Sequence, residues 1–205
     1  MTVTTMADPI DHIRKHIDIT SEMESSLRQM MSEAHFRRGQ TKFSNHELRS
    51  LAFFIRKGSA RSFYIHAGKE HTYSFTLDDD FITIPKAIAN LVPDVTIGIE
   101  FMEPTEVVFI PIADMRTIIN RYGHKHIAEV LSYMISVLFE HSQNIEEHML
   151  VLQSLSATER YRWFTQKYPA ILERASLTQI ASFLGITKET LYRIRGENIN
   201  QNEPR

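Results

Sequence analysis

Near the C-terminal end of the chain, the stretch TKETLYRIR (residues 187–195) places hydroxyl, basic and acidic side chains around two aliphatic ones. Leu191 and Ile194 recur at helical spacing, so Lys188 and Arg193 lie on other faces of the helix. Arginine, lysine, glutamate and threonine are side chains that contact base edges and phosphates in DNA. The stretch therefore has the composition of a helix that binds DNA.

A second helical pattern lies directly before this stretch and must position it. Its apolar residues recur at helical spacing and are Leu177, Ile180, Ala181 and Leu184. Gly185 can adopt the left-handed conformation that closes a helix, and Thr187 is a good N-cap for the next one. Two helices joined in this way predict a helix-turn-helix, whose second helix enters the DNA major groove. The spacing alone also fits an ordinary helical hairpin.

Composition limits the class of protein. With 205 residues, 42% of them hydrophobic, and a formal net charge of −2, the chain is globular, with one large domain or two small ones. No apolar run reaches the roughly 18 residues of a membrane span, and the N-terminus does not resemble a signal peptide. Cysteine is absent, which excludes disulfides, thiolate catalysis and cysteine-ligated metal or iron–sulfur sites. We expect a cytoplasmic protein without a membrane partner, metal or cofactor.

Charge is distributed unevenly along the chain. Residues 1–152 contain 15 Lys+Arg and 20 Asp+Glu, whereas residues 153–205 contain 8 and 5. A mildly basic C-terminal part on an acidic body indicates that this end binds DNA.

The hydrophobic periodicity changes twice along the chain. Residues 8–34 show helical spacing, and residues 35 to about 110 contain short β-rich runs separated by turn signals such as Lys57-Gly58-Ser59 and Glu103-Pro104. Short strands at this spacing indicate a small β-barrel or β-roll. Helical patterns return from about residue 113, so the predicted fold class is α+β.

A long helix is predicted from His124 to about Gln153, after a short helix, Met115 to Tyr122, that ends at Gly123. Its inner positions recur every 3.5 residues, as in helices that pack along their length. They are Ile127, Leu131, Met134, Leu138, His141, Ile145, His148 and Leu152. A helix of about 30 residues is ~45 Å long, too long for one small barrel to cover, so we predict a two-fold dimer seam. The alternative is that the barrel covers the first half and the C-terminal domain covers the second.

Two histidines on this seam suggest a switch. His141 and His148 would meet their twins across the dimer axis and would titrate near pH 6.5. The hypothesis is a pH- or metal-responsive hinge, and the alternative is that the rings are simply hydrated there.

The order of these elements resembles the Crp/Fnr family of bacterial transcription regulators, over roughly residues 30 to 196. HFRRGQTKF and AFFIRKGSARSF are similar to strands of the family's roll, with Gly39 and Gly58 at its glycines. SATERYRWFTQKYPAILERASLTQIASFLGITKETLYRIR, which opens with a capping box at Ser156 to Glu159, is the closest match. It looks most like short members whose chains stop soon after the recognition helix.

The resemblance implies three parts. Residues 1–123 are expected to form N-terminal helices and a double-stranded β-roll like those that bind cyclic nucleotides, and residues 124–153 a dimerisation helix. Residues 154–205 are expected to form an all-α helix-turn-helix domain of winged-helix type that lacks most of the β-wing. The expected function is regulation of transcription by a dimer on a palindromic DNA site, with RNA polymerase as a further partner and no effector that the sequence can name.

The resemblance also implies which residues contact DNA. They are Thr178, Gln179, Thr187, Lys188, Glu189, Thr190, Arg193 and Arg195. Arg193 can make a bidentate contact to guanine, and Glu189 can accept from a cytosine amino group. Thr178 and Gln179, which open the first helix, could fix the register on the DNA backbone. Arg195 is expected to contact phosphate or to be merely exposed.

The roll departs from the family's cyclic-nucleotide cassette. The Gly-Glu pair that begins the family's cassette corresponds to positions near Thr83-Ile84 in this chain. The Arg-Ser pair that ends it corresponds to positions near Val95-Thr96. Between Phe81 and Phe101 the only cation is Lys86. Since an anion without a paired cation is costly to bury, cyclic AMP and cyclic GMP are not expected to bind in the usual way.

Two other classes of function remain as alternatives. A cupin-like metal enzyme would need His-x-His on barrel strands, but the only such motif, His124-Lys125-His126, opens the long helix, so no enzyme is predicted. The second alternative is a ligand-binding or interaction module of the same fold that has lost DNA binding.

Overall fold

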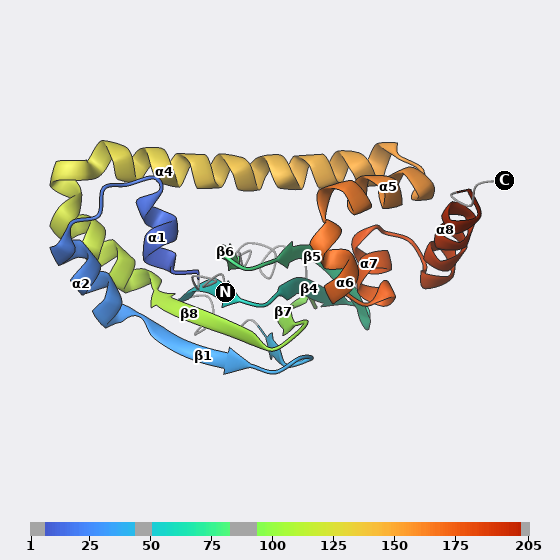
Figure 1. Ribbon diagram of the computed structural model, residues 1–205, viewed down its shortest axis with the longest axis horizontal. Coiled ribbons are helices and arrows are strands. Elements are labelled where there is room, and N and C mark those ends of the chain that lie inside the picture. The colour runs from blue at the N-terminus through green and yellow to red at the C-terminus, as the bar shows by residue number, and fades with distance from the viewer. Residues whose placement is uncertain (1–6, 44–50, 83–93, 202–205) are drawn as a thin grey trace, which may run out of the picture.

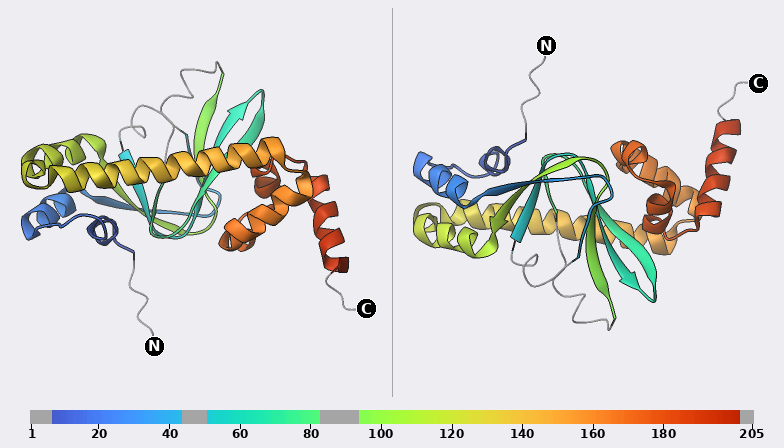
Figure 2. Two further views of the ribbon diagram at one scale, coloured as in Figure 1. Left: turned by 90° about the horizontal axis from the view of Figure 1, so that it is seen from above. Right: turned by 90° about the horizontal axis from the view of Figure 1, so that it is seen from below.

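The computed structural model describes residues 7–43, 51–82 and 94–201, and it is drawn in Figure 1. A long helix, α4 (Ile112–Ser154), runs the length of the molecule above two β-sheets. Seen from above, α4 crosses over the sheets and joins the N-terminal helices at one end to the C-terminal helices at the other (Figure 2). The predicted α+β class is confirmed.

The β-rich segment folds into two antiparallel four-stranded sheets. One has the order β1 (Ser32–Phe36), β8 (Thr105–Pro111), β3 (Leu51–Lys57), β6 (Asp80–Ile82). The other has the order β2 (Thr41–Phe43), β7 (Thr96–Phe101), β4 (Ala60–His66), β5 (Lys69–Thr76). Both sheets contribute side chains to one apolar core, so the pair is here called the roll. The core comprises Phe36, Phe53, Ile55, Ala60, Ile82, Ile99, Phe101 and Val107.

The strands lie where alternation and turn signals predict them. β3 and β4 meet at Gly58, whose φ of +110° requires glycine, and β7 and β8 are separated by Glu103-Pro104. Gly39, between β1 and β2, also has a positive φ, +77°. The turn glycines set the strand register, so that Ile99 and Phe101 of β7 face the core.

The prediction of N-terminal helices over residues 8–34 was wrong only at its end, because the helical segment stops at Met30. The structure has α1 (Pro9–Arg14) and α2 (Ser21–Met30), and β1 already begins at Ser32. The break comes from a second N-cap: the Thr20 hydroxyl accepts a hydrogen bond from the backbone N–H of Met23, 3.3 Å away. Helix α1 lies between α4 and the roll (Figure 1), where Ile10 is fully buried.

The predicted end of a short helix at Gly123 was also wrong. Backbone hydrogen bonding continues through Gly123, and α4 is one helix of 43 residues. Its axis nevertheless changes direction in its first part, near α2 (Figure 1). A glycine inside a helix lowers its intrinsic stability without preventing it when neighbouring elements pack on it, as α2 does here.

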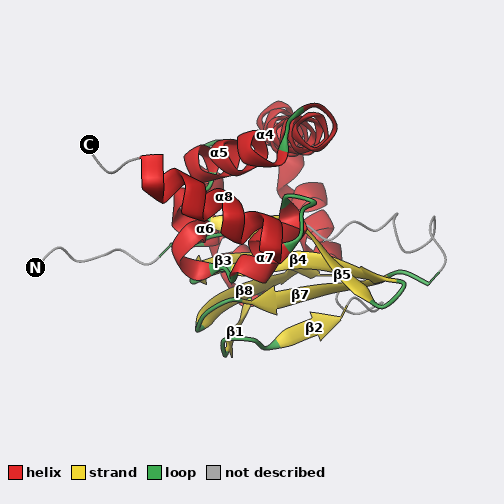
Figure 3. Ribbon diagram, turned by 90° about the vertical axis from the view of Figure 1, so that its right-hand side faces the viewer, coloured by secondary structure: helices red, strands yellow, loops and turns green. Residues whose placement is uncertain are grey.

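Four helices follow α4 and are here called the C-terminal unit. They are α5 (Ala157–Lys167), α6 (Pro169–Arg174), α7 (Leu177–Phe183) and α8 (Lys188–Gln201). The predicted capping box at Ser156 and Glu159 is present, and Ser176 and Gln179 form a second one at α7. Helix α6, which the sequence reading left without an assignment, begins at Pro169 as proline favours. Figure 3 shows the unit gathered against one end of the roll.

Gly58 provides a test of the turn that links β3 to β4. A Cβ at Gly58 would lie 2.5 Å from Thr105 Oγ1 and 2.9 Å from the Pro104 carbonyl oxygen. We expect Gly58→Ala to lower the free energy of unfolding by about 3 kcal/mol, from left-handed strain plus overpacking. The control is Gly39→Ala, which also has a positive φ, +77°, but no atom within 4 Å of the added Cβ, and it should cost about 1 kcal/mol. Equal losses in urea denaturation would contradict the packing argument.

Candidate nucleic-acid interface

Helix α8 is amphipathic, as the spacing of its apolar residues predicts. Leu191 and Ile194 are fully buried. Thr187 is the N-cap, since its hydroxyl accepts from the Thr190 N–H at 3.2 Å. The predicted contact residues on the other faces are Thr187, Lys188, Glu189, Arg193 and Arg195, all exposed, and Thr190, half-buried. The outer face of α8 therefore offers these polar side chains to solvent, with the Arg193 side chain 67% exposed.

The turn before α8 is closed by backbone hydrogen bonds. Gly185 has φ +63°. Its N–H donates to the Ser182 carbonyl at 3.2 Å, and the Ile186 N–H donates to the Ala181 carbonyl at 3.0 Å. This pair of bonds is a Schellman motif, and it sets the angle at which α8 leaves α7.

Arg160 of α5, which sequence reasoning missed, holds the ends of α4 and α7 together. Its guanidinium donates to the carbonyls of Leu155 at 2.9 Å, Leu184 at 3.1 Å and Leu152 at 2.6 Å. These carbonyls lie at the end of α4 and the end of α7, where helices leave acceptors unsatisfied. A basic residue near the start of a helix interacts unfavourably with the helix dipole. The position of Arg160 in the first turns of α5 was therefore the one sign in the sequence that this side chain has a compensating contact elsewhere.

His148 does not lie free on the outside of α4. Its ring stacks on Phe183 of α7, with centroids 4.0 Å apart, and lies parallel to Trp163 of α5 at 6.0 Å. Its Nε2 is 2.9 Å from the Phe183 carbonyl oxygen and therefore donates to it. The prediction that His148 meets its twin was wrong, because the ring is occupied within its own chain. At this position the alternative holds, in which the C-terminal domain covers the second half of the helix.

The rest of the predicted seam is only partly described. Ile127, Leu131, Met134 and Leu138 lie in α4, but their side chains lie outside the described residues. His141 and Leu152 are half-buried, and Ile145 is 56% exposed. Further large apolar side chains exposed on α4 are Ile135, Phe139, Met149 and Leu150. The dimer seam stays a prediction.

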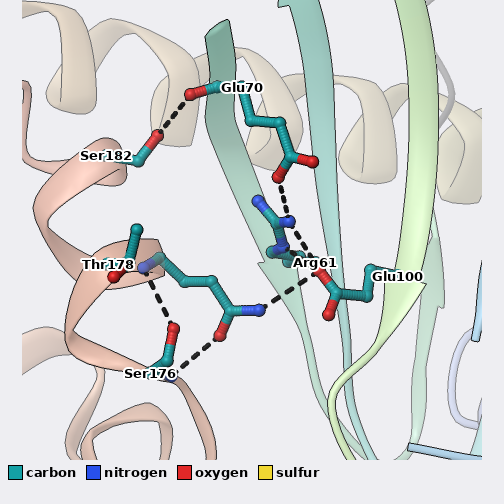
Figure 4. Close-up of a pocket in the computed structure, with 7 residues that line it drawn as sticks. Arg61, Glu70, Glu100, Ser176, Thr178 and Ser182 are labelled. Atoms are coloured by element: carbon teal, nitrogen blue, oxygen red, sulfur yellow. Dashed lines mark hydrogen bonds and ion pairs between the residues drawn. The ribbon is translucent and has the colours of Figure 1, made fainter. Parts of the chain in front are cut away.

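Thr178 and Gln179 are not grouped with the α8 residues. They line a pocket of about 180 Å³ between α7 and the roll, drawn in Figure 4. Gln179 accepts from the Ser176 N–H through Oε1, at 2.8 Å. Its Nε2 donates to Glu100 of β7 at 3.2 Å. In this arrangement Gln179 is engaged by the roll, while Thr178 is exposed at the pocket.

The floor of this pocket is a buried arginine, Arg61, whose guanidinium forms ion pairs with two glutamates. Arg61 of β4 is 5% exposed and binds Glu100 at 2.6 Å, Thr72 Oγ1 at 2.9 Å and the carboxylate of Glu70. Its guanidinium also lies 4.4 Å from the centre of the Phe63 ring. Two carboxylates against one cation leave the pocket with an excess of negative charge.

Most of the residues that correspond to the cyclic-nucleotide cassette lie outside the described ranges. Thr83-Ile84 and Lys86 lie outside the described residues, and Val95-Thr96 lead into β7. Within the described ranges no cluster of three or more His, Asp or Glu side chains could hold a metal ion. None of the described helices is both long enough and apolar enough to cross a membrane.

Arg160 can be tested against its exposed neighbour Arg162. Arg160→Gln should lower the free energy of unfolding by about 2 kcal/mol, because the carbonyls at two helix ends lose a charged donor. Arg162→Gln, the same change on an exposed side chain of α5, should alter it by less than about 0.5 kcal/mol. Chemical denaturation monitored by Trp163 fluorescence measures both. Similar effects of the two substitutions would rule out this role of Arg160.

The environment of His148 predicts a pH effect on stability. Burial lowers the pKa of His148 below its ordinary 6.5, although the hydrogen bond to Phe183 acts in the other direction, and Lys167 nearby lowers it further. The unfolded chain therefore binds a proton at His148 more readily than the folded chain does. The contribution of neutral His148 to the free energy of unfolding is present above about pH 6.5 and is lost as the pH falls below it. The midpoint of urea denaturation should fall less between about pH 7.5 and pH 5.5 in His148→Gln than in the wild type. The control, exposed His66→Gln, should keep the wild-type pH dependence.

Comparison with known proteins finds relatives by structure and not by sequence. No protein-family model matches the chain, and no curated protein matches it. FixK2 from Bradyrhizobium japonicum superposes with a TM-score of 0.67 at 17% identity, over 83% of this chain and 85% of that one. A regulator from Eubacterium rectale assigned to the Crp/Fnr family gives 0.66 at 16% identity, over 89% and 85%.

A third structure agrees with these two. The c-di-GMP-responsive global regulator CLP from Xanthomonas campestris has a TM-score of 0.64 at 12% identity, over 91% of this chain and 96% of that one. Identities this low establish the architecture and leave the chemistry to the chain's own residues. The roll, the long helix and the C-terminal unit together have the Crp/Fnr-type fold.

Proposed function

We propose that the protein is a sequence-specific DNA-binding regulator of transcription that acts as a dimer on a palindromic site. The observation that carries the proposal is the outer face of α8. A helix whose apolar side is fully buried presents two arginines, a lysine, a glutamate and a threonine to solvent, at the end of the molecule away from α2 (Figure 1). These are the groups that contact base edges and phosphates in a major groove.

In this proposal α7 and α8 are the helix-turn-helix, and α8 is the recognition helix. Arg193 has its guanidinium 3.0 Å from Glu197 one turn on, an exposed pair that a guanine can replace at little cost. The Lys188 ammonium lies 5.8 Å from the centre of the exposed Tyr192 ring, which keeps it near the start of α8. Arg195, which is exposed, is expected to contact a phosphate.

The division into parts follows the same proposal. Residues 1–123 would comprise the N-terminal helices, the roll and the first part of α4, residues 124–153 the dimerisation helix, and residues 154–205 the DNA-binding domain. The roll serves as a dimer scaffold or holds an effector, and cyclic AMP and cyclic GMP are not the expected effectors. RNA polymerase is the further partner that such a regulator would contact on DNA.

The dimer is supported by apolar surface on α4. Ile135, Phe139, Ile145 and Met149 are each about half exposed or more, and they lie within one side of the helix. A second copy of α4 would cover them, and it would set the two recognition helices one turn of DNA apart, ~34 Å.

The DNA proposal predicts a particular change in specificity. Purified protein, incubated with a genomic fragment library at two salt concentrations, should recover a palindrome. Arg193→Ala should lose about tenfold in affinity for that palindrome and relax one base position in each half-site, because it removes a bidentate base contact. The control is Arg37→Ala, an equal loss of charge at an exposed site between β1 and β2, and it should leave the base preference unchanged. Recovery of no motif by any of the proteins would support the alternative of a module that has lost DNA binding.

The dimer proposal is tested by sedimentation equilibrium. Ile145→Glu should shift the protein from dimer to monomer, since it buries a charge in an apolar interface. Asn144→Glu is the matched control, because Asn144 is exposed and points toward Lys167 of α5. A dimer that withstands Ile145→Glu as well as it withstands Asn144→Glu would place the interface elsewhere.

A further inference from the structure

The C-terminal unit is fastened to the roll as well as to α4. At the centre of the contact, Phe75, Leu77 and Met102 of the roll pack into the apolar cluster that contains Phe164 and Phe183. Met102 is 3% exposed and Phe183 is also 3% exposed. This apolar centre is surrounded by polar contacts, as in a specific interface between two bodies.

One polar contact joins α7 to the edge of a sheet. β5 is the last strand in its sheet order, so its outer backbone groups have no further strand to pair with among the described residues. The Ser182 hydroxyl accepts from the Thr72 N–H at 2.9 Å and donates to the Glu70 carbonyl at 3.2 Å. Helix α7 thus covers the free edge of β5 and satisfies one donor and one acceptor there.

Two further contacts lie on either side of this one. On the α7 side, Gln179 donates to Glu100, whose carboxylate is held by Arg61 (Figure 4). On the α6 side, Arg174 Nη1 is 2.9 Å from Asp78 and 3.2 Å from Glu103. These contacts connect β5, β7 and the turns that follow each of them to α6 and α7, and so hold the C-terminal unit in one orientation.

We propose that this contact is autoinhibitory, because the roll and the DNA backbone compete for the same face of α7. The inference rests on the proposed function. While Gln179 donates one amide hydrogen to Glu100, a phosphate that approached its second N–H, or Thr178, would face the carboxylates of Glu70 and Glu100 in the same pocket. The charge of Arg61 is already used by those carboxylates, so it offers no compensation.

The geometry separates the two helices in their access to DNA. The contact side chains of α8 are exposed or half-buried in the docked arrangement, whereas Gln179 and Ser182 of α7 are half-buried and hydrogen-bonded to the roll. DNA can therefore meet α8 first, and full engagement requires α7 to leave the roll. The apparent affinity is then lowered by the fraction of molecules in which α7 is released. An effector or partner that loosens the contact would act as an activator of DNA binding.

The first test weakens the contact without touching any residue proposed to bind DNA. Arg174→Gln removes the link to Asp78 and Glu103 and should raise the affinity for the palindromic duplex by roughly threefold to tenfold, through a larger released fraction. Arg28→Gln is the control, since Arg28 forms an exposed pair with Asp8 and Glu24 far from the C-terminal unit. It should leave the affinity unchanged. Equal affinities for wild type and Arg174→Gln would overturn the inference.

The second test locks the contact. Because the chain has no cysteine, the pair Ser182→Cys and Glu70→Cys can form only this disulfide within a chain. We expect it to form under mild oxidation, to weaken DNA binding by at least about tenfold, and to release full binding on reduction. Equal affinity of the oxidised and reduced forms would overturn the inference while leaving the proposed function in place. Absence of DNA binding in the wild type, the reduced pair and Arg174→Gln alike would instead overturn the proposed function.

Discussion

The packing of one side chain, Phe183, links the parts of this molecule. It stacks on His148 of α4 at 4.0 Å and lies 5.1 Å from Phe75 of β5 and 5.6 Å from Phe164 of α5, measured between ring centroids. Aromatic rings packed from several directions have few alternative arrangements, so α7 is held relative to the long helix and the roll at once. Helix α8 follows α7 through a turn closed by backbone bonds, and its position is set by the same contact.

The molecule therefore connects its roll to α8 by two routes. One runs directly from the β5 edge through Ser182 to α7. The other runs along α4 to Arg160, which joins the end of that helix to the end of α7. A change at the roll or along α4 reaches α8 through α7 and α5, which both contact it. Any ligand that causes such a change must bind the two arrangements of the C-terminal unit with different affinities.

Local patterns in the sequence predict the local structure well. Strand alternation and the turn at Gly58 place the roll, and the apolar stripe of Leu191 and Ile194 places the polar face of α8. The sequence cannot predict which surface covers an apolar or aromatic face, because a period of 3.5 residues is the same for any partner. His148 was accordingly assigned to a second copy of the helix, although it packs on Phe183 of its own chain. Arg160 and the contact of α7 with β5 depend on elements far apart in the sequence, and no short motif marks them.

The most direct measurement of the central claim is the distance between α5 and the roll in solution, with and without DNA. Spin labels at Arg162→Cys and Lys69→Cys, two exposed positions, report it in a chain that has no other cysteine, after dilution with unlabelled protein to suppress signals between subunits. The account predicts one narrow distance distribution in the free protein and a second, displaced distribution when the palindromic duplex is added. A single unchanged distribution in the presence of saturating DNA would show that α7 binds DNA without leaving the roll, and would contradict the account.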